Sequence, residues 1–193
     1  MIGFEGKVVS SAVEPLLPAG LSLRFIDNPY WEKQNGISVL AGASFLANPF
    51  ILTMSDHLFD QAIIDRLIAD SAPEQLNLAV DRKLDSIFDR DDAMKVQTRG
   101  KQIVTLGKDL LEYDAIDTGV FVCPPEMFAH LERARAEADG DCSLADGVRS
   151  MAMEGRARAV DIGDAWWQDV DTAEMHANAE RHLRARAALA DHV

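Results

Sequence analysis

The sequence predicts an α/β protein with a mixed, mostly parallel sheet, flanking helices and a small antiparallel insert. Three observations lead to this fold class. Short apolar runs of strand length alternate with helical stretches, which is typical of helices that cover a largely buried sheet. Residues 50–54 are almost continuously apolar, as expected for a central strand buried on both faces. Residues 95–98 and 101–104 flank a predicted tight turn and would form an antiparallel hairpin.

The elements before the hairpin follow from local apolar patterns. Residues 21–26 alternate apolar and polar side chains, so we expect a short strand there. After the central strand, Asp60 is a predicted N-cap, and the apolar stripe within residues 63–68 predicts a helix. Alternation over residues 76–80 predicts the next strand, and we interpret the charged segment 81–92 as a solvated loop.

The remaining elements have equally local signals. In order, they are a hairpin turn at Arg99 and Gly100, a strand at 115–123, a helix beginning near Met127, a helix at 143–153, extended segments at 160–162 and 166–170, and a last helix from about Ala173. No internal repeat or convincing domain boundary interrupts this order.

Charge and composition exclude several classes of function. The 193 residues include 32 acidic and 19 basic side chains, and the formal net charge of -13 would repel nucleic acid and anionic lipid. The sequence has no apolar run long enough to span a membrane and no signal-peptide pattern, so we expect a cytoplasmic protein. Cys123 and Cys142 have no neighbours at zinc-binding spacing and are predicted to be free thiols.

Asp56 is the first candidate for a functional carboxylate, because it directly follows the most hydrophobic predicted strand. In open α/β sheets, ligands bind beyond the carboxyl ends of strands. A partly buried carboxylate needs a cation or hydrogen-bond donors to offset its desolvation, so a metal role is reasonable. The alternative is that Asp56 only caps a turn. We interpret the adjacent His57 as a polar turn residue.

A second group of carboxylates lies near the C-terminal end. Asp169 and Asp171 project to the same face of an extended segment and could present oxygens to one hard cation. Asp171 and Glu174 also have the spacing of a helix capping box, and on local grounds capping is the favoured role. The two roles are compatible. We interpret Trp166 and Trp167 beside these carboxylates as packing residues.

Lys108 and Asp117 are candidates for ligand contacts. Lys108 follows the hairpin and would offer a cation to a phosphate, although a solvated lysine has the same local pattern. Asp117 is a charged residue within an apolar strand, where it must pair with a cation or hydrogen-bond a hydroxylated ligand.

Six segments carry a resemblance to a known family. They are 32–40 (EKQNGISVL), 53–57 (TMSDH), 79–81 (AVD), 116–119 (IDTG), 161–164 (DIGD) and 167–172 (WQDVDT). In this order they resemble the nucleotidyltransferases that couple nucleoside triphosphates to phosphorylated sugars or alcohols, and most closely the inositol-1-phosphate and phosphocholine cytidylyltransferases. The resemblance implies a Rossmann-like sheet, with CTP or another nucleoside triphosphate and a phosphorylated alcohol or sugar as substrates.

The same resemblance implies a metal-dependent reaction. Asp56 and Asp171 would hold a catalytic Mg²⁺, with Asp169 as an alternate or neighbouring carboxylate. The acceptor phosphate would attack the α-phosphorus of CTP in line and release pyrophosphate, a reaction that depends on positioning and charge neutralisation. This interpretation requires residues 56 and 171 to converge on a shared ion.

The resemblance also implies the substrate contacts. Asn35, Gly36 and Ser38 would lie near the nucleobase. Lys108 and Asp117 would meet the phosphate and hydroxyls of the acceptor, and Lys108 would count among the catalytic residues.

One family feature has no counterpart in this sequence, namely the glycine-rich loop that cradles the triphosphate. Residues 3–6 instead resemble a stretch after the family's second or third strand. We therefore expect a single nucleotidyltransferase-like domain over residues 1–193 that is incomplete at its N-terminus and impaired as an isolated chain. The alternatives are a non-catalytic binding or assembly subunit, half of a split enzyme, and a metal-dependent glycosyltransferase. Exposed sheet edges would then pair with a partner chain or a second copy.

Overall fold

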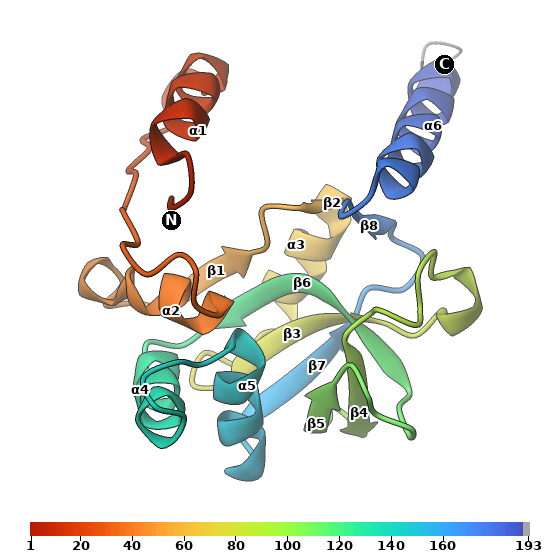
Figure 1. Ribbon diagram of the computed structural model, residues 1–193. Coiled ribbons are helices and arrows are strands. Elements are labelled where there is room, and N and C mark those ends of the chain that lie inside the picture. Colours follow the sequence, from red (N-terminus) through yellow and green to blue (C-terminus); the bar gives the residue numbers. More distant parts are fainter. Residues whose placement is uncertain (191–193) are drawn as a thin grey trace.

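The computed structural model describes residues 1–190 and is built around one six-stranded sheet (Figure 1). Its strands, in the spatial order β1-β6-β3-β7-β5-β4, are β1 (Phe50–Thr53), β6 (Ala115–Cys123), β3 (Leu76–Asp81), β7 (Ala157–Asp161), β5 (Gln102–Gly107) and β4 (Lys95–Arg99). A separate antiparallel ribbon consists of β2 (His57–Phe59) and β8 (Trp167–Asp169). The helices are α1 (Gly6–Val13), α2 (Asn35–Leu40), α3 (Gln61–Ala69), α4 (Met127–Glu137), α5 (Leu144–Met153) and α6 (Ala173–Ala190), with short 3-10 turns at Glu14–Leu16, Ala43–Phe45 and Leu84–Ser86. None of the helices among these residues is both long enough and apolar enough to cross a bilayer.

The sheet is mostly antiparallel, so the prediction of a mostly parallel, Rossmann-like sheet is wrong, whereas the mixed α/β class with flanking helices is confirmed. Among the described strands of this sheet, only β3 and β7 pair in parallel. β4 also pairs with β6, so β6, β3, β7, β5 and β4 close into a small barrel. A continuous apolar run indicates burial on both faces, but it does not reveal the direction of the neighbouring strands.

β1 is an edge strand rather than the predicted central strand. It pairs with β6 alone among the described strands, and its side chains alternate between half-buried and exposed, with Ile51 44% exposed. β3 is central instead, and all its residues are buried. The strand expected at residues 21–26 is absent; one isolated bridge joins Ile2 to Asp27, and Leu23 stays exposed. Apolar alternation cannot supply the partner edge that a strand needs.

The predicted hairpin is confirmed, and it completes the barrel. Its turn lies one residue later than expected, at Gly100 and Lys101, because Arg99 pairs with Gln102. The outer edges of the hairpin are sparsely joined: β5 meets β7 at a single register pair, Gln102 with Arg158, and β4 meets β6 at two. The antiparallel insert is thus part of the main sheet.

Helices cover both faces of the sheet. α2, α4 and α5 lie on one face, where Leu131 and Val148 pack against side chains of β3 and β6. α3 covers the other face, where Leu67 is fully buried. Cys123 and Cys142 lie in the first core as free thiols, as predicted, and burial raises the pKa of Cys123 to about 12.

The predicted helix starts after Asp60 and near Ser143 are correct in position, but the one predicted cap, Asp60, is wrong. Ser143 and Asp146 form a reciprocal capping box at the start of α5. Asp60 precedes α3 without capping it. Its carboxylate instead accepts a hydrogen bond from the backbone N–H of Trp166 (3.0 Å) and pairs with Arg186. Asp60 therefore ties the start of α3 to the C-terminal segment.

Residues 1–31, which we call the N-terminal arm, lie outside the sheet (Figure 1). α1 in this arm buries none of its residues. Large apolar side chains of the arm, including Phe4, Leu16 and Trp31, are exposed. Within the described residues, the arm therefore adds little to either core.

Gly119 in β6 generates a prediction about packing, because its φ of +73° lies in the left-handed region and a Cβ there would come within 2.5 Å of the His57 ring. We expect Gly119→Ala to lower the free energy of unfolding by about 1–2 kcal/mol through backbone strain. Overpacking should add about 1–3 kcal/mol. Urea denaturation measures the loss.

Gly100→Ala is the matched control for this experiment. Gly100 has a φ of +63°, and a Cβ there meets no described atom within 4 Å. Gly100→Ala should therefore lose unfolding free energy through backbone strain alone, with no added loss from overpacking. Equal losses in the two variants would contradict the contact between Gly119 and His57.

Candidate active site

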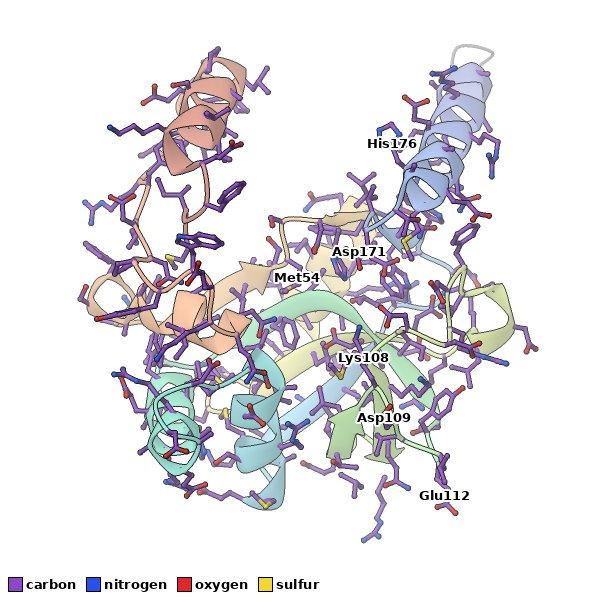
Figure 2. All side chains as sticks on the ribbon, in the orientation of Figure 1. Met54, Lys108, Asp109, Glu112, Asp171 and His176 are labelled. Atoms are coloured by element: carbon purple, nitrogen blue, oxygen red, sulfur yellow. The ribbon has the colours of Figure 1, made fainter. Side chains whose placement is uncertain are left out.

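A cleft of about 360 Å³ opens against β6, between the β2–β8 ribbon on one side and the end of β5 with α5 on the other. Figure 2 shows three of its lining residues, Met54, Lys108 and Asp171, around the middle of β6. The predicted site residues that line it are Asn35, Lys108, Asp117, Asp169 and Asp171. Segments that are distant in the sequence therefore meet at one hollow.

The β2–β8 ribbon brings the segments of the predicted metal carboxylates together, although Asp56 itself does not line the cleft. His57 lies opposite Asp169 in its register, and the backbone N–H of Val170 donates to the carbonyl oxygen of Asp56 at 2.9 Å. Asp56 is thereby held beside the segment that carries Asp171. The two backbone segments therefore lie side by side, and convergence of the two carboxylates on one ion stays a prediction.

His57 is the centre of this side of the cleft, although no sequence signal distinguishes it from a turn residue. Its Nδ1 lies 2.7 Å from the Asp56 carboxylate, and its ring stacks on Trp167 with centroids 5.8 Å apart. The other side of the ring rests on Gly119, where a side chain would not fit. The glycine within the largely apolar strand at 115–123 was the one available clue, because a glycine in a strand indicates close approach by another group.

Two carboxylates near His57 are held in an unfavourable environment for charge. Burial raises the pKa of Asp117 to about 6, although the backbone N–H of Gly119 (2.7 Å) and His57 act in the opposite direction. Burial also raises the pKa of Asp169, and the charge of Asp171 adds to this effect. The positive charge available among the described residues does not offset the desolvation of these groups.

Asp171 does not cap the last helix, so the capping interpretation is wrong. α6 begins at Ala173, and the Oγ1 of Thr172 accepts the hydrogen bond from the backbone N–H of Met175 at 3.2 Å. Thr172 is thus the N-cap. The carboxylate of Asp171 is exposed and lies at the cleft, where it is available to a ligand.

The carboxylates fit part of a magnesium shell. Mg²⁺ is commonly held by one or two carboxylates, and substrate phosphates and water supply the remaining oxygens. Asp56 and Asp171, on adjacent segments, match that partial donor set. Within residues 1–190, no three His, Cys, Asp or Glu side chains form a ready metal site. The metal role of Asp56 and Asp171 therefore stays a prediction, and Asp169 is the neighbouring carboxylate.

The opposite rim of the cleft is cationic. Lys108 lies just beyond β5, and its Nζ pairs with Asp92 at 2.8 Å. Arg149 of α5 lines the same rim, donating to the backbone oxygen of Leu106 at 3.0 Å and pairing with Asp146. Arg149 has no local sequence pattern that distinguishes it from the other arginines of the C-terminal third, so its position at the cleft could not be predicted.

The three residues predicted near the nucleobase have different positions. Asn35 lines the cleft, and its Oδ1 accepts from the backbone N–H of Leu144 at 2.8 Å. Gly36 packs so closely on the loop before α5 that a Cβ would lie 2.6 Å from the carbonyl oxygen of Cys142. Ser38 accepts a hydrogen bond from Asn28 at 2.9 Å. Neither Gly36 nor Ser38 lines the cleft, so contact with a base stays a prediction for them.

Solved structures share this architecture. The “inositol-1-phosphate CTP transferase from T. maritima” superposes with a TM-score of 0.74 at 23% identity, over 88% of this chain and 67% of that one. A “putative glucose-1-phosphate thymidylyltransferase from Bacillus anthracis” gives a TM-score of 0.70 at 14% identity, over 90% of this chain and 70% of that one. Their common fold is the one described for this chain.

Curated sequences point to the same family, although no family model matches the chain. The chain is 35% identical over 171 residues to the “Bifunctional IPC transferase and DIPP synthase” of Thermococcus kodakarensis, covering 85% of this chain and 36% of the relative. A relative with the same name from Rubrobacter xylanophilus is 32% identical over 176 residues, covering 90% and 38%. The chain belongs to the nucleotidyltransferase family, as the resemblance indicated. It spans a little over a third of the length of these two relatives.

The raised pKa of Asp117 predicts a specific pH dependence of stability. Between the ordinary pKa of 3.8 and about 6, the folded chain keeps a proton that the unfolded chain releases. The contribution of Asp117 to stability should therefore fall as the pH rises through this window, by up to about 1.4 kcal/mol per pH unit. Asp117→Asn removes this contribution, so its unfolding free energy should decline less between pH 4 and pH 6.

Denaturant unfolding at several pH values measures the effect. Asp109→Asn is the control, because it removes an exposed carboxylate of the loop after β5. Its pH profile should run parallel to that of the wild type. A parallel profile for Asp117→Asn as well would show that Asp117 is not the desolvated group.

Proposed function

We propose that the chain is a cytidylyltransferase that transfers a cytidylyl group from CTP to a phosphorylated alcohol such as inositol 1-phosphate and releases pyrophosphate. The observation that carries the proposal is the arrangement of charge in the cleft. Asp169 and Asp171 line one side, where the backbone of Asp56 is hydrogen-bonded to the neighbouring Val170, and Lys108 lies on the other. The relatives named as IPC transferases and the inositol-1-phosphate CTP transferase fold support the choice of substrates.

The reaction forms a bond between an oxygen of the acceptor phosphate and the α-phosphorus of CTP, and it breaks the bond to the leaving pyrophosphate. The chain contributes position and charge rather than a covalent intermediate. Lys108 releases Asp92 and attracts the acceptor phosphate. Asp117 accepts a hydrogen bond from an acceptor hydroxyl, and Asn35 offers its amide to the base. His57 orients the carboxylate of Asp56.

A magnesium ion held by Asp56 and Asp171 would neutralise phosphate charge and orient the triphosphate. Asp169 remains the neighbouring carboxylate, and its raised pKa follows from burial and from the charge of Asp171. Such clustering of like charges is typical of a place that receives a cation.

A second candidate, a non-catalytic assembly subunit or half of a split enzyme, has its own support. β1 pairs on one edge only among the described strands, and the N-terminal arm exposes apolar side chains. An unpaired edge can accept a strand from another chain or a second copy. Light scattering of the purified chain, alone and after addition of CTP, separates this candidate from a monomeric enzyme.

The metal claim makes a quantitative prediction. Pyrophosphate release should require CTP, inositol 1-phosphate and Mg²⁺, and Asp56→Asn or Asp171→Asn should each lower kcat/KM on the order of 100-fold. Mg²⁺ affinity, titrated by calorimetry without substrates, should fall at least about tenfold in both variants.

Asp164→Asn is the matched control, because it removes an exposed carboxylate of the same C-terminal segment that lies before the β2–β8 ribbon. It should behave as the wild type. Unchanged Mg²⁺ affinity in both Asp56→Asn and Asp171→Asn would refute the metal site, and self-association of a wild type that binds neither CTP nor Mg²⁺ would favour the assembly candidate.

A further inference from the structure

The cations of the cleft gather at one place, which is notable in a chain with a net charge of -13. Arg149 donates to the backbone oxygen of Leu106, and Lys108 follows two residues later. Lys95 is buried and donates to the backbone oxygens of Asp91 (2.9 Å) and Lys108 (2.5 Å). Three positive side chains therefore surround the short segment at the end of β5.

Two of these three cations have carboxylate partners. Asp92 pairs with Lys108, and Asp146 pairs with Arg149. Lys95 forms no ion pair among the described residues; its ammonium contacts carbonyl oxygens and the ring of Tyr113. Lys108 and Arg149 line the cleft, and buried Lys95 adds a cation with no carboxylate partner among the described residues, so this rim would favour an anion.

Arg149 is held in a fixed orientation that leaves donors free. Its Nη1 is committed to Leu106 and its Nη2 to Asp146. A guanidinium has five N–H donors, so further donors remain after these two contacts. The side chain is 38% exposed and lines the cleft. An arginine anchored in this way loses little conformational entropy when it binds a ligand.

We propose that Arg149 is a substrate-binding residue that, together with Lys108, holds the phosphate of the acceptor. The acceptor is a phosphomonoester, and the inference rests on the proposed function. The planar guanidinium orients two phosphate oxygens. The ammonium of Lys108 supplies a point charge once its ion pair with Asp92 is broken. The phosphate thereby lies across the cleft from Asp169 and Asp171.

The test measures binding without turnover. Calorimetry records the affinity of the full chain for inositol 1-phosphate, phosphocholine, glycerol 3-phosphate and free inositol, without nucleotide or metal. Arg149→Gln should weaken binding of each phosphomonoester that the wild type binds by about 10- to 100-fold, the value of a charged hydrogen bond. Arg149→Lys should recover only part of the loss, because lysine restores the positive charge but not the planar pair of N–H donors. CTP affinity should stay within about twofold.

Arg133→Gln is the matched control, since it removes an exposed helical arginine that pairs with Glu154 at 3.0 Å outside the cleft. Its binding should equal that of the wild type. Wild-type affinity in Arg149→Gln, an equal loss for CTP and phosphomonoesters, or no phosphomonoester binding by the wild type would each overturn the inference. Phosphomonoester binding that depends on Arg149, without pyrophosphate release, would instead overturn the proposed function and keep the inference.

Discussion

The pairing of β2 with β8 is the constraint on which the site depends. β2 follows the edge strand β1, and β8 precedes α6, so this short ribbon joins the middle of the chain to its C-terminal segment. Backbone hydrogen bonds make the contact, and they place Asp56 beside the segment of Asp171 whatever charge those side chains carry. Repulsion between solvated like charges at contact distance is only on the order of 1 kcal/mol. The ribbon therefore fixes the two backbone segments side by side before any ligand is present.

The electrostatic character of the cleft follows from which elements meet there. On the ribbon side, the imidazole of His57 lowers the pKa values of Asp117 and Asp169, but burial has the larger effect and both pKa values are raised. The β5 side carries lysine and arginine side chains that are anchored by backbone oxygens. A phosphate ester accompanied by a divalent cation has the complementary distribution of charge. The two sides are thus suited to different parts of one substrate complex.

Much of the secondary structure could be predicted from the sequence, because the signals are local. The strand at 115–123 and the capping box at Ser143 depend on neighbouring side chains alone. The direction of the sheet and the edge position of β1 depend on pairing, which no local pattern contains. The same limit applies to the site: Asp171 was visible as a carboxylate, but the cap is provided by Thr172. His57 and Arg149 gain their roles only through contacts that form on folding.

The N-terminal arm has a consequence for how the protein behaves in solution. Its exposed valine, leucine and aromatic side chains, and the edge of β1 that has no partner among the described strands, are surfaces through which copies could associate. Repulsion between the highly charged copies opposes this association. The Debye length shrinks from roughly 30 Å at 0.01 M salt to roughly 8 Å at 0.15 M. Colloidal stability is therefore set by ionic strength, and added salt favours clustering of this chain through surfaces that dilute buffer keeps separate.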